Sequence, residues 1–292
     1  MPAWIKQVLR LLVFGNCWVS FAAVCLYWET ALLHHLEFSS RLSISIFGAT
    51  LFIYNYHRLF RKRVIYSVER STRHRWIVSN DKLLTGFAVL GGLTGFISFL
   101  PYFTQTFFLR ILPFLLIALL YVVPVGKRNG KWFSLRDLPF LKIFLVAAVW
   151  AFVTAFIPFL SRDAQWLPTA SVWLTFAHRF VFIFAITLPF DVRDLAHDRK
   201  YGVVTFASRF GVNGIKSGAR LLLVFIAAAG LCGYLAGWYS PGQGLGLVIS
   251  AASTGWLISR MREDSDEWYY AGFLDGTMVD QLFWIFVMGL VG

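Results

Sequence analysis

The sequence predicts an all-α integral membrane protein with nine transmembrane helices. Only 14% of its 292 residues are charged, whereas 58% are hydrophobic. A soluble domain carries about 25% charged residues, so this chain has too few to cover a water-exposed surface of its size. Long apolar segments also recur at regular intervals. Together these observations exclude a soluble enzyme and indicate a polytopic membrane protein.

Each apolar segment is close to the roughly 20 residues that a helix needs to cross a bilayer. Lipid admits only helices and closed barrels, and these runs are too long and too continuously apolar for barrel strands. The predicted spans are residues 8–33, 42–58, 83–102, 106–125, 141–160, 171–190, 217–239, 242–259 and 275–291. No small-residue cleavage site follows the first span, which we interpret as a retained helix. All nine spans are expected to form one domain, residues 1–292.

The net charge of +12 is explained by orientation in the membrane rather than by nucleic acid. With the N-terminus in the cytoplasm, 23 of the 27 Lys and Arg residues fall in cytoplasmic segments, as the positive-inside rule requires. Twelve of the 15 acidic residues lie on the same side. Acids contribute little to topology, so their position predicts that the cytoplasmic loops carry the chemistry.

The most informative segment begins where the sixth predicted span leaves the membrane. Asp191, Asp194 and Asp198 are spaced i, i+3, i+7, which places them on one face of a helix. Such carboxylates repel one another unless a cation lies among them, and Mg²⁺ is usually held by one or two carboxylates together with substrate phosphates. The alternative interpretation is a solvated loop helix with mixed charges.

The segment from Asp191 to Arg199, followed by Gly202-x-x-Thr205, resembles the second aspartate-rich motif of UbiA-type membrane prenyltransferases. Residues 121–124, Tyr-Val-Val-Pro, precede Lys127 and Arg128 and are similar to that family's tyrosine–proline–basic signature. The nine-span layout extends the resemblance over most of the chain.

The resemblance implies a nine-helix UbiA-like bundle that transfers an isoprenyl group, rather than a methyl group, from its diphosphate to a lipophilic acceptor such as an aromatic ring. The three aspartates would be catalytic and hold Mg²⁺. Lys127, Arg128 and Arg199 would contact the diphosphate. The expected partners are an isoprenyl diphosphate, the acceptor and membrane lipids, with the active-site loops in the cytoplasm.

The chain departs from the family at the first aspartate-rich motif, which is expected at the end of the second span. Asn55 keeps the leading asparagine, but Tyr56 and Leu59 stand where aspartates are expected. Asn55, Arg58 and Lys62 instead repeat the i, i+3, i+7 spacing, 136 residues before the three aspartates. We interpret this as a charge-inverted motif that contacts the diphosphate directly. The alternative is a basic stretch that only orients the protein.

Two other function classes stay open. An inactive relative that binds an isoprenoid or another lipid phosphate would also lack the first aspartates. A transporter would explain His178 and Arg179 within the sixth span, unless Arg179 snorkels outward or pairs with a neighbouring helix. A transporter should concentrate polar groups at the midplane, whereas the carboxylates here gather at one rim. The acidic run 263–267 is interpreted as a solvated loop, and Asp275 and Asp280 as acids at a helix start.

Overall fold

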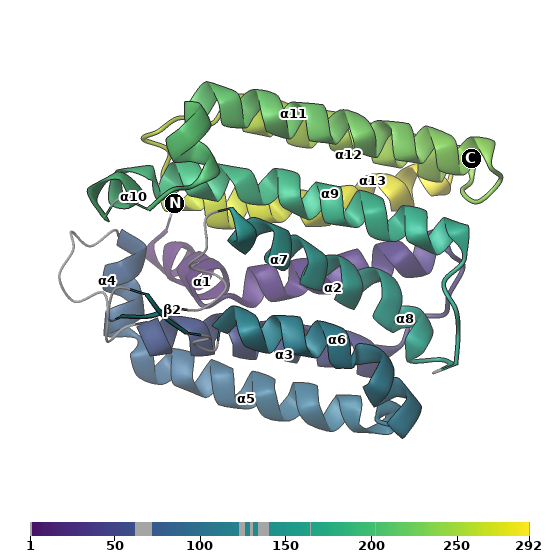
Figure 1. Ribbon diagram of the computed structural model, residues 1–292, viewed down its shortest axis with the longest axis horizontal. Helices are drawn as coiled ribbons and strands as arrows, with labels where there is room; N and C mark the ends of the chain where they lie inside the picture. Colours follow the sequence, from purple (N-terminus) through teal and green to yellow (C-terminus); the bar gives the residue numbers. More distant parts are fainter. Residues whose placement is uncertain are drawn as a thin grey trace.

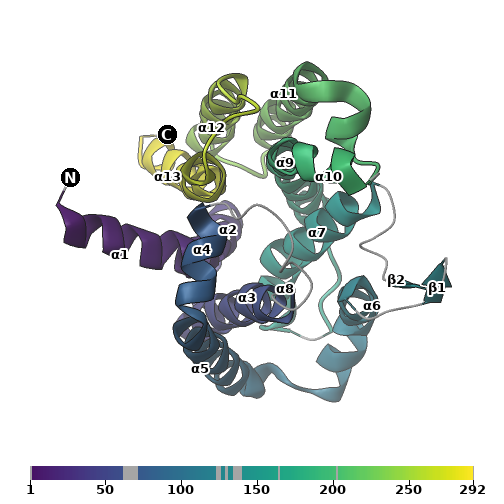
Figure 2. The same cartoon turned by 90° about the vertical axis from the view of Figure 1, so that its left-hand side faces the viewer.

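The computed structural model describes residues 2–61, 72–122, 126–128, 131–133, 140–163, 165–201 and 203–291. Long helices run side by side in a bundle, seen from the side in Figure 1 and along the helix axes in Figure 2. The α-helices are α1 (Ala3–Phe14), α2 (Cys17–Leu33), α3 (Ser40–Arg61), α4 (Thr72–Ser79), α5 (Asp81–Phe99), α6 (Gln105–Val122), α7 (Leu141–Ala151), α8 (Ile157–Leu160), α9 (Ala170–Arg193), α10 (Leu195–Tyr201), α11 (Phe206–Leu235), α12 (Pro241–Ser259) and α13 (Asp275–Gly289). A short 3₁₀ turn, η1 (Leu100–Tyr102), and two π-helical turns, η3 (Phe152–Phe156) and η4 (Tyr269–Leu274), complete the helical elements of the described residues.

Five helical segments in the described part of the chain are long and apolar enough to cross a membrane, and α1 with α2 makes a sixth if this bent pair is counted as one span. The five are Asp81–Tyr102, Leu141–Leu160, Ala170–Arg193, Phe206–Leu235 and Tyr269–Gly289. The protein is thus an integral multi-pass membrane protein, but the predicted count of nine spans is not confirmed. Predicted spans 42–58 and 242–259 form α3 and α12 without being among the five. Span 106–125 contributes the shorter apolar stretch Gln105–Leu116.

The first predicted span, residues 8–33, is not one helix. α1 and α2 are bent by 58° relative to each other, and Asn16 between them adopts a left-handed φ of 68°. Asn55 of α3 stabilises the turn. Its Oδ1 accepts from Asn16 Nδ2 at 2.8 Å, and its Nδ2 donates to the carbonyl oxygens of Gly15 and Leu51 at 3.1 and 2.9 Å. α1 therefore leaves the bundle sideways, as Figure 2 shows.

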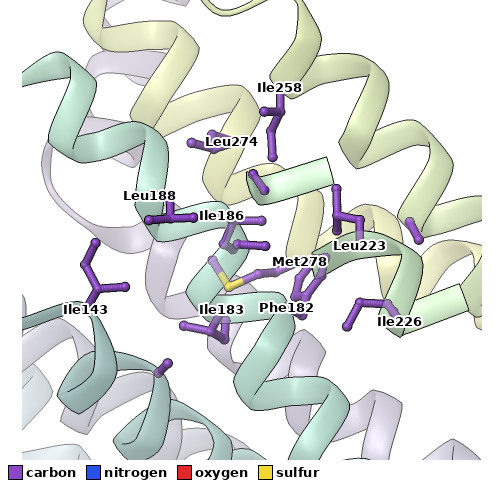
Figure 3. Packing of buried hydrophobic residues seen from close by; sticks show 14 of the residues in the cluster. Ile143, Phe182, Ile183, Ile186, Leu188, Leu223, Ile226, Ile258, Leu274 and Met278 are labelled. Atoms are coloured by element: carbon purple, nitrogen blue, oxygen red, sulfur yellow. The ribbon is translucent and has the colours of Figure 1, made fainter. Parts of the chain in front are cut away.

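The largest hydrophobic core lies around α9, which packs against α7 and α11. Phe182 and Ile186 of α9 are almost completely buried there, together with Leu223 of α11 and Met278 of α13. Figure 3 shows these side chains converging from separate helices. α3 lies in a different part of the bundle, where it packs against α5 and α2. The end of α9 that carries the aspartate motif is therefore fixed by the main core.

A buried ion pair joins α9 to α2, roughly three turns before the aspartate motif. Arg179 is fully buried and its Nη2 lies 2.9 Å from Glu29 Oε1. Its Nη1 donates to the Leu26 carbonyl oxygen at 2.6 Å and to Thr154 Oγ1 at 3.1 Å, and Nη2 donates to Thr30 Oγ1 at 3.4 Å. Arg179 therefore pairs with a neighbouring helix and does not snorkel outward. One guanidinium thereby ties together α2, η3 and α9.

We expect Arg179→Met to destabilise the protein by about 3–5 kcal/mol, because it leaves the Glu29 carboxylate buried without its counter-ion. Thermal unfolding of the detergent-solubilised protein measures the effect. The double variant Glu29→Gln/Arg179→Met should recover part of the loss, and Arg220→Met, which removes an exposed arginine of α11, serves as the control. A single variant as stable as the wild type would contradict the assignment.

Candidate functional site

The three aspartates of the motif lie at one end of the bundle, where α9 gives way to α10 (Figure 1). α9 ends at Arg193 and α10 begins at Leu195. Asp194 stands between them, although the Asp198 N–H still donates to its carbonyl oxygen at 2.9 Å. The predicted single helical face is therefore interrupted at the middle aspartate, a residue type whose side chain competes with the backbone for hydrogen bonds.

Asp191 is paired with a lysine of the neighbouring helix α7. Its Oδ1 lies 3.9 Å from Lys142 Nζ. The aspartate side chain is only 5% exposed, whereas that of the lysine is 37% exposed. Lys142 thus brings a positive charge from a partly exposed position toward a buried carboxylate.

Asp194 belongs to an ion network that joins three segments far apart in the sequence. Arg193 Nε donates to Asp194 Oδ1 at 2.9 Å and Nη2 donates to Oδ2 at 3.1 Å, a two-pronged contact. Arg193 Nη1 lies 3.8 Å from Glu267 Oε2, and Arg73 Nη1 lies 3.4 Å from that same oxygen. The network therefore links the end of α9 to α4 and to the segment that precedes η4.

Aromatic rings flank both arginines of the network. The Arg193 guanidinium carbon lies 5.1 Å from the ring centre of Phe190 and 5.9 Å from that of Tyr270. The corresponding distance from Arg73 to Phe14 is 5.7 Å. Rings in these positions attract a cation by their negative faces and keep water away from it.

Burial lowers the pKa of Arg73, and the nearby charge of Arg193 adds to the effect, whereas the carboxylates of Glu267 and Asp275 oppose it. The guanidinium nevertheless stays charged at neutral pH, as arginine does in proteins. The side chain of Glu267 is 20% exposed. Interpreting residues 263–267 as a solvated loop is correct for Asp264, an exposed partner of Arg262, but wrong for Glu267.

Asn55 and Arg58, both predicted to contact diphosphate, contact the α1–α2 turn in the structure. Asn55 is fully buried, and both hydrogens of its amide are donated to backbone carbonyl groups. This leaves no amide N–H for a ligand, so Asn55 has a structural role in this structure. Arg58 is half-buried, and its Nη1 donates to the Phe14 carbonyl oxygen at 3.5 Å.

Three of the remaining predicted basic residues, Lys127, Arg128 and Arg199, lie in the described part of the chain. Lys62 lies outside the described residues. Lys127 and Arg128 belong to strand β1 (Gly126–Arg128), which pairs antiparallel with β2 (Lys131–Phe133); only their backbone is described. This hairpin is an addition to the predicted all-α fold. Arg199 is exposed on α10. The paired arrangement of an acidic and a basic helix end stays a prediction.

The aspartates have the right donor chemistry for Mg²⁺, because carboxylate oxygens are the ligands that this hard cation prefers. Within the described residues, however, no three Asp, Glu, His or Cys side chains are close enough together to hold a metal ion. Lys142 contacts Asp191 and Arg193 contacts Asp194. A metal ion at these two carboxylates would therefore either share them with their cationic partners or displace those partners.

The fold and the charged end of the bundle define a class: multi-pass α-helical membrane proteins with paired acidic and basic residues at the end of the bundle where α9 meets α10, which we call the mouth. No protein-family model matches the chain, and no curated protein matches it in sequence. Solved structures do match. A UbiA homologue from Archaeoglobus fulgidus bound to GPP and Mg²⁺ gives a TM-score of 0.58 at 14% identity, covering 96% of this chain and 98% of that chain.

Two further structures agree with this result. A UbiA homologue from Aeropyrum pernix K1, without ligand, gives a TM-score of 0.57 at 16% identity and covers 93% of this chain and 95% of that chain. A digeranylgeranylglyceryl phosphate synthase gives 0.54 at 14% identity, covering 99% and 98%. The chain has the UbiA-type fold over nearly its whole length, which confirms, for the fold, the resemblance inferred from the aspartate motif.

Three residues of this site, Arg73, Lys142 and Glu267, were not predicted from the sequence. Arg73 and Lys142 are single basic residues among many on the predicted cytoplasmic side. Glu267 is the last residue of an acidic run whose other members gave no reason to set it apart. No spacing rule connects these positions, because the contacts that unite them are made between segments distant in the sequence.

We expect Asn55→Leu to lower thermal stability. The polar groups of the α1–α2 turn that now bond to Asn55 would stay buried without a partner, which costs about 1–3 kcal/mol for each group. Unfolding in detergent measures the loss, and proteolysis should cut more readily near Asn16. The exposed Asn213→Ala of α11 is the control. If Asn55→Leu instead abolished diphosphate binding without loss of stability, the structural role would be refuted.

Proposed function

We propose that this protein is a membrane transferase that moves an isoprenyl group from its diphosphate to a lipophilic acceptor such as an aromatic ring. The observation that carries the proposal is the placement of the Asp191–Arg199 motif at one mouth of a UbiA-type fold. A structural neighbour bound to GPP and Mg²⁺ supports an isoprenyl diphosphate as donor. The positive-inside distribution of Lys and Arg supports a cytoplasmic position for this mouth.

The residues of the mouth have complementary roles in this proposal. Asp191, Asp194 and Asp198 would hold Mg²⁺, which when bound neutralises charge on the departing diphosphate. Lys142 and Arg193 are cations at the same carboxylates and can donate to phosphate oxygens. The allylic carbon–oxygen bond breaks with its electron pair going to the diphosphate. The acceptor then bonds to that carbon and loses a proton.

Aromatic side chains suit the electron-poor carbon formed in such a transfer. Tyr54 of α3 and Trp150 of α7 meet edge to face, with ring centres 6.4 Å apart. Both are partly buried and pack against the main core. Ring faces carry partial negative charge, so they can stabilise a cationic centre without acting as nucleophiles or bases.

The direct test uses purified protein in lipid nanodiscs with labelled isoprenyl diphosphates of several chain lengths, with and without Mg²⁺. We expect Mg²⁺-dependent release of diphosphate. It should fall about 100-fold in Asp194→Asn, equivalent to loss of about 2.7 kcal/mol of transition-state stabilisation. Asp264→Asn, which neutralises an exposed aspartate, should leave release unchanged.

The same experiment separates this function from a lipid-binding one. The second candidate is favoured by Asn55, the surviving member of the first motif, whose amide is used inside the protein. Tight binding of an isoprenyl diphosphate with no release at any chain length or acceptor would support that candidate and overturn the transferase proposal.

A further inference from the structure

Arg193 and a divalent cation compete for the same atoms of Asp194. The arginine contacts both carboxylate oxygens, at 2.9 and 3.1 Å. A guanidinium in this two-pronged arrangement covers the edge of the carboxylate that would face a chelated cation. If Asp194 binds a divalent cation through that edge, Arg193 has to leave it.

Glu267 lies where a departing Arg193 can find a new partner. Its Oε2 is already 3.8 Å from Arg193 Nη1, on the side of the guanidinium away from the Nε–Oδ1 contact. The side chains of Arg193 and Glu267 are 26% and 20% exposed. In so enclosed a position, an arginine without a carboxylate would be costly, whereas a small shift toward Glu267 keeps its charge paired.

Arg73 keeps Glu267 in place for this exchange. Its Nη1 lies 3.4 Å from the Glu267 oxygen that faces Arg193, and its side chain is 9% exposed beside the Phe14 ring. The carboxylate is therefore anchored from α4 on one side and open to Arg193 on the other. When Asp194 binds a cation, movement of Arg193 would therefore change the contacts made by α4 and by the segment before η4.

We propose that Glu267 is a positioning residue that accepts Arg193 when Asp194 binds a divalent cation, so that it favours metal binding without touching the metal. This inference rests on the proposed function, because it takes Asp194 as a metal ligand. A fixed structural tie is the other interpretation of the same contacts. In that case, removing either Arg193 or Glu267 would weaken metal binding by loosening the α9–α10 junction.

The test measures Mn²⁺ binding to the full chain in nanodiscs by the electron paramagnetic resonance signal of free Mn²⁺, with thermal unfolding recorded for every variant. We expect Glu267→Gln to bind Mn²⁺ about tenfold more weakly, a change of about 1.4 kcal/mol, because Arg193 then stays on Asp194. Glu267→Asp should restore part of the affinity. Arg193→Gln should bind Mn²⁺ at least as tightly as the wild type.

The double variant Arg193→Gln/Glu267→Gln is decisive, since Glu267 should matter only while Arg193 is present. Its affinity should equal that of Arg193→Gln. Asp264→Asn, in the same acidic run and exposed, is the matched control and should behave as the wild type. Weaker binding in Arg193→Gln, or equal losses from Glu267→Gln with and without Arg193, would overturn the inference.

Asp194→Asn separates this failure from failure of the proposed function. If wild-type Mn²⁺ binding does not depend on Asp194, the metal role in the proposed function is wrong and the exchange falls with it. If binding depends on Asp194 but Glu267→Gln matches Asp264→Asn, the exchange alone is wrong and the transferase proposal stands.

Discussion

Inside a bilayer a polar side chain has no water to bond, so each one must find its partners within the protein. The Arg179–Glu29 pair follows this constraint, because both charged side chains are fully buried and each is the partner of the other. Its guanidinium reaches α2 and η3 from α9, and a charge that would be costly alone holds three elements together. The bundle that carries the aspartate motif is thus organised around a polar contact as well as around its apolar core.

The same constraint acts differently at the mouth of the bundle, where side chains are partly exposed. There the carboxylates are paired with cations by contacts of 2.9–3.9 Å, and the side chains of these cations, Lys142 and Arg193, are 37% and 26% exposed. Partial solvation lowers the cost of changing partners. The interior ion pair is suited to permanent structure, whereas the ion pairs of the mouth can exchange partners at lower cost.

The sequence was sufficient to predict the membrane class, the helical fold and the end of α9 on which the motif lies, because these depend on local composition and spacing. It was insufficient for the α1–α2 break, since the left-handed Asn16 is stabilised by Asn55 of another helix. The sequence also led to the wrong interpretation of Glu267 as part of a solvated loop, because its environment depends on Arg73 and Arg193. Periodicity describes one helix at a time, whereas these contacts join segments brought together by folding.

The α1–α2 turn also has a consequence for biogenesis. Asn16 and its partner Asn55 are 39 residues apart, so the N-terminal segment leaves the ribosome before the residue that fixes its bend. The hydrogen bonds that hold the bend between α1 and α2 can therefore form only once Asn55 of α3 is present.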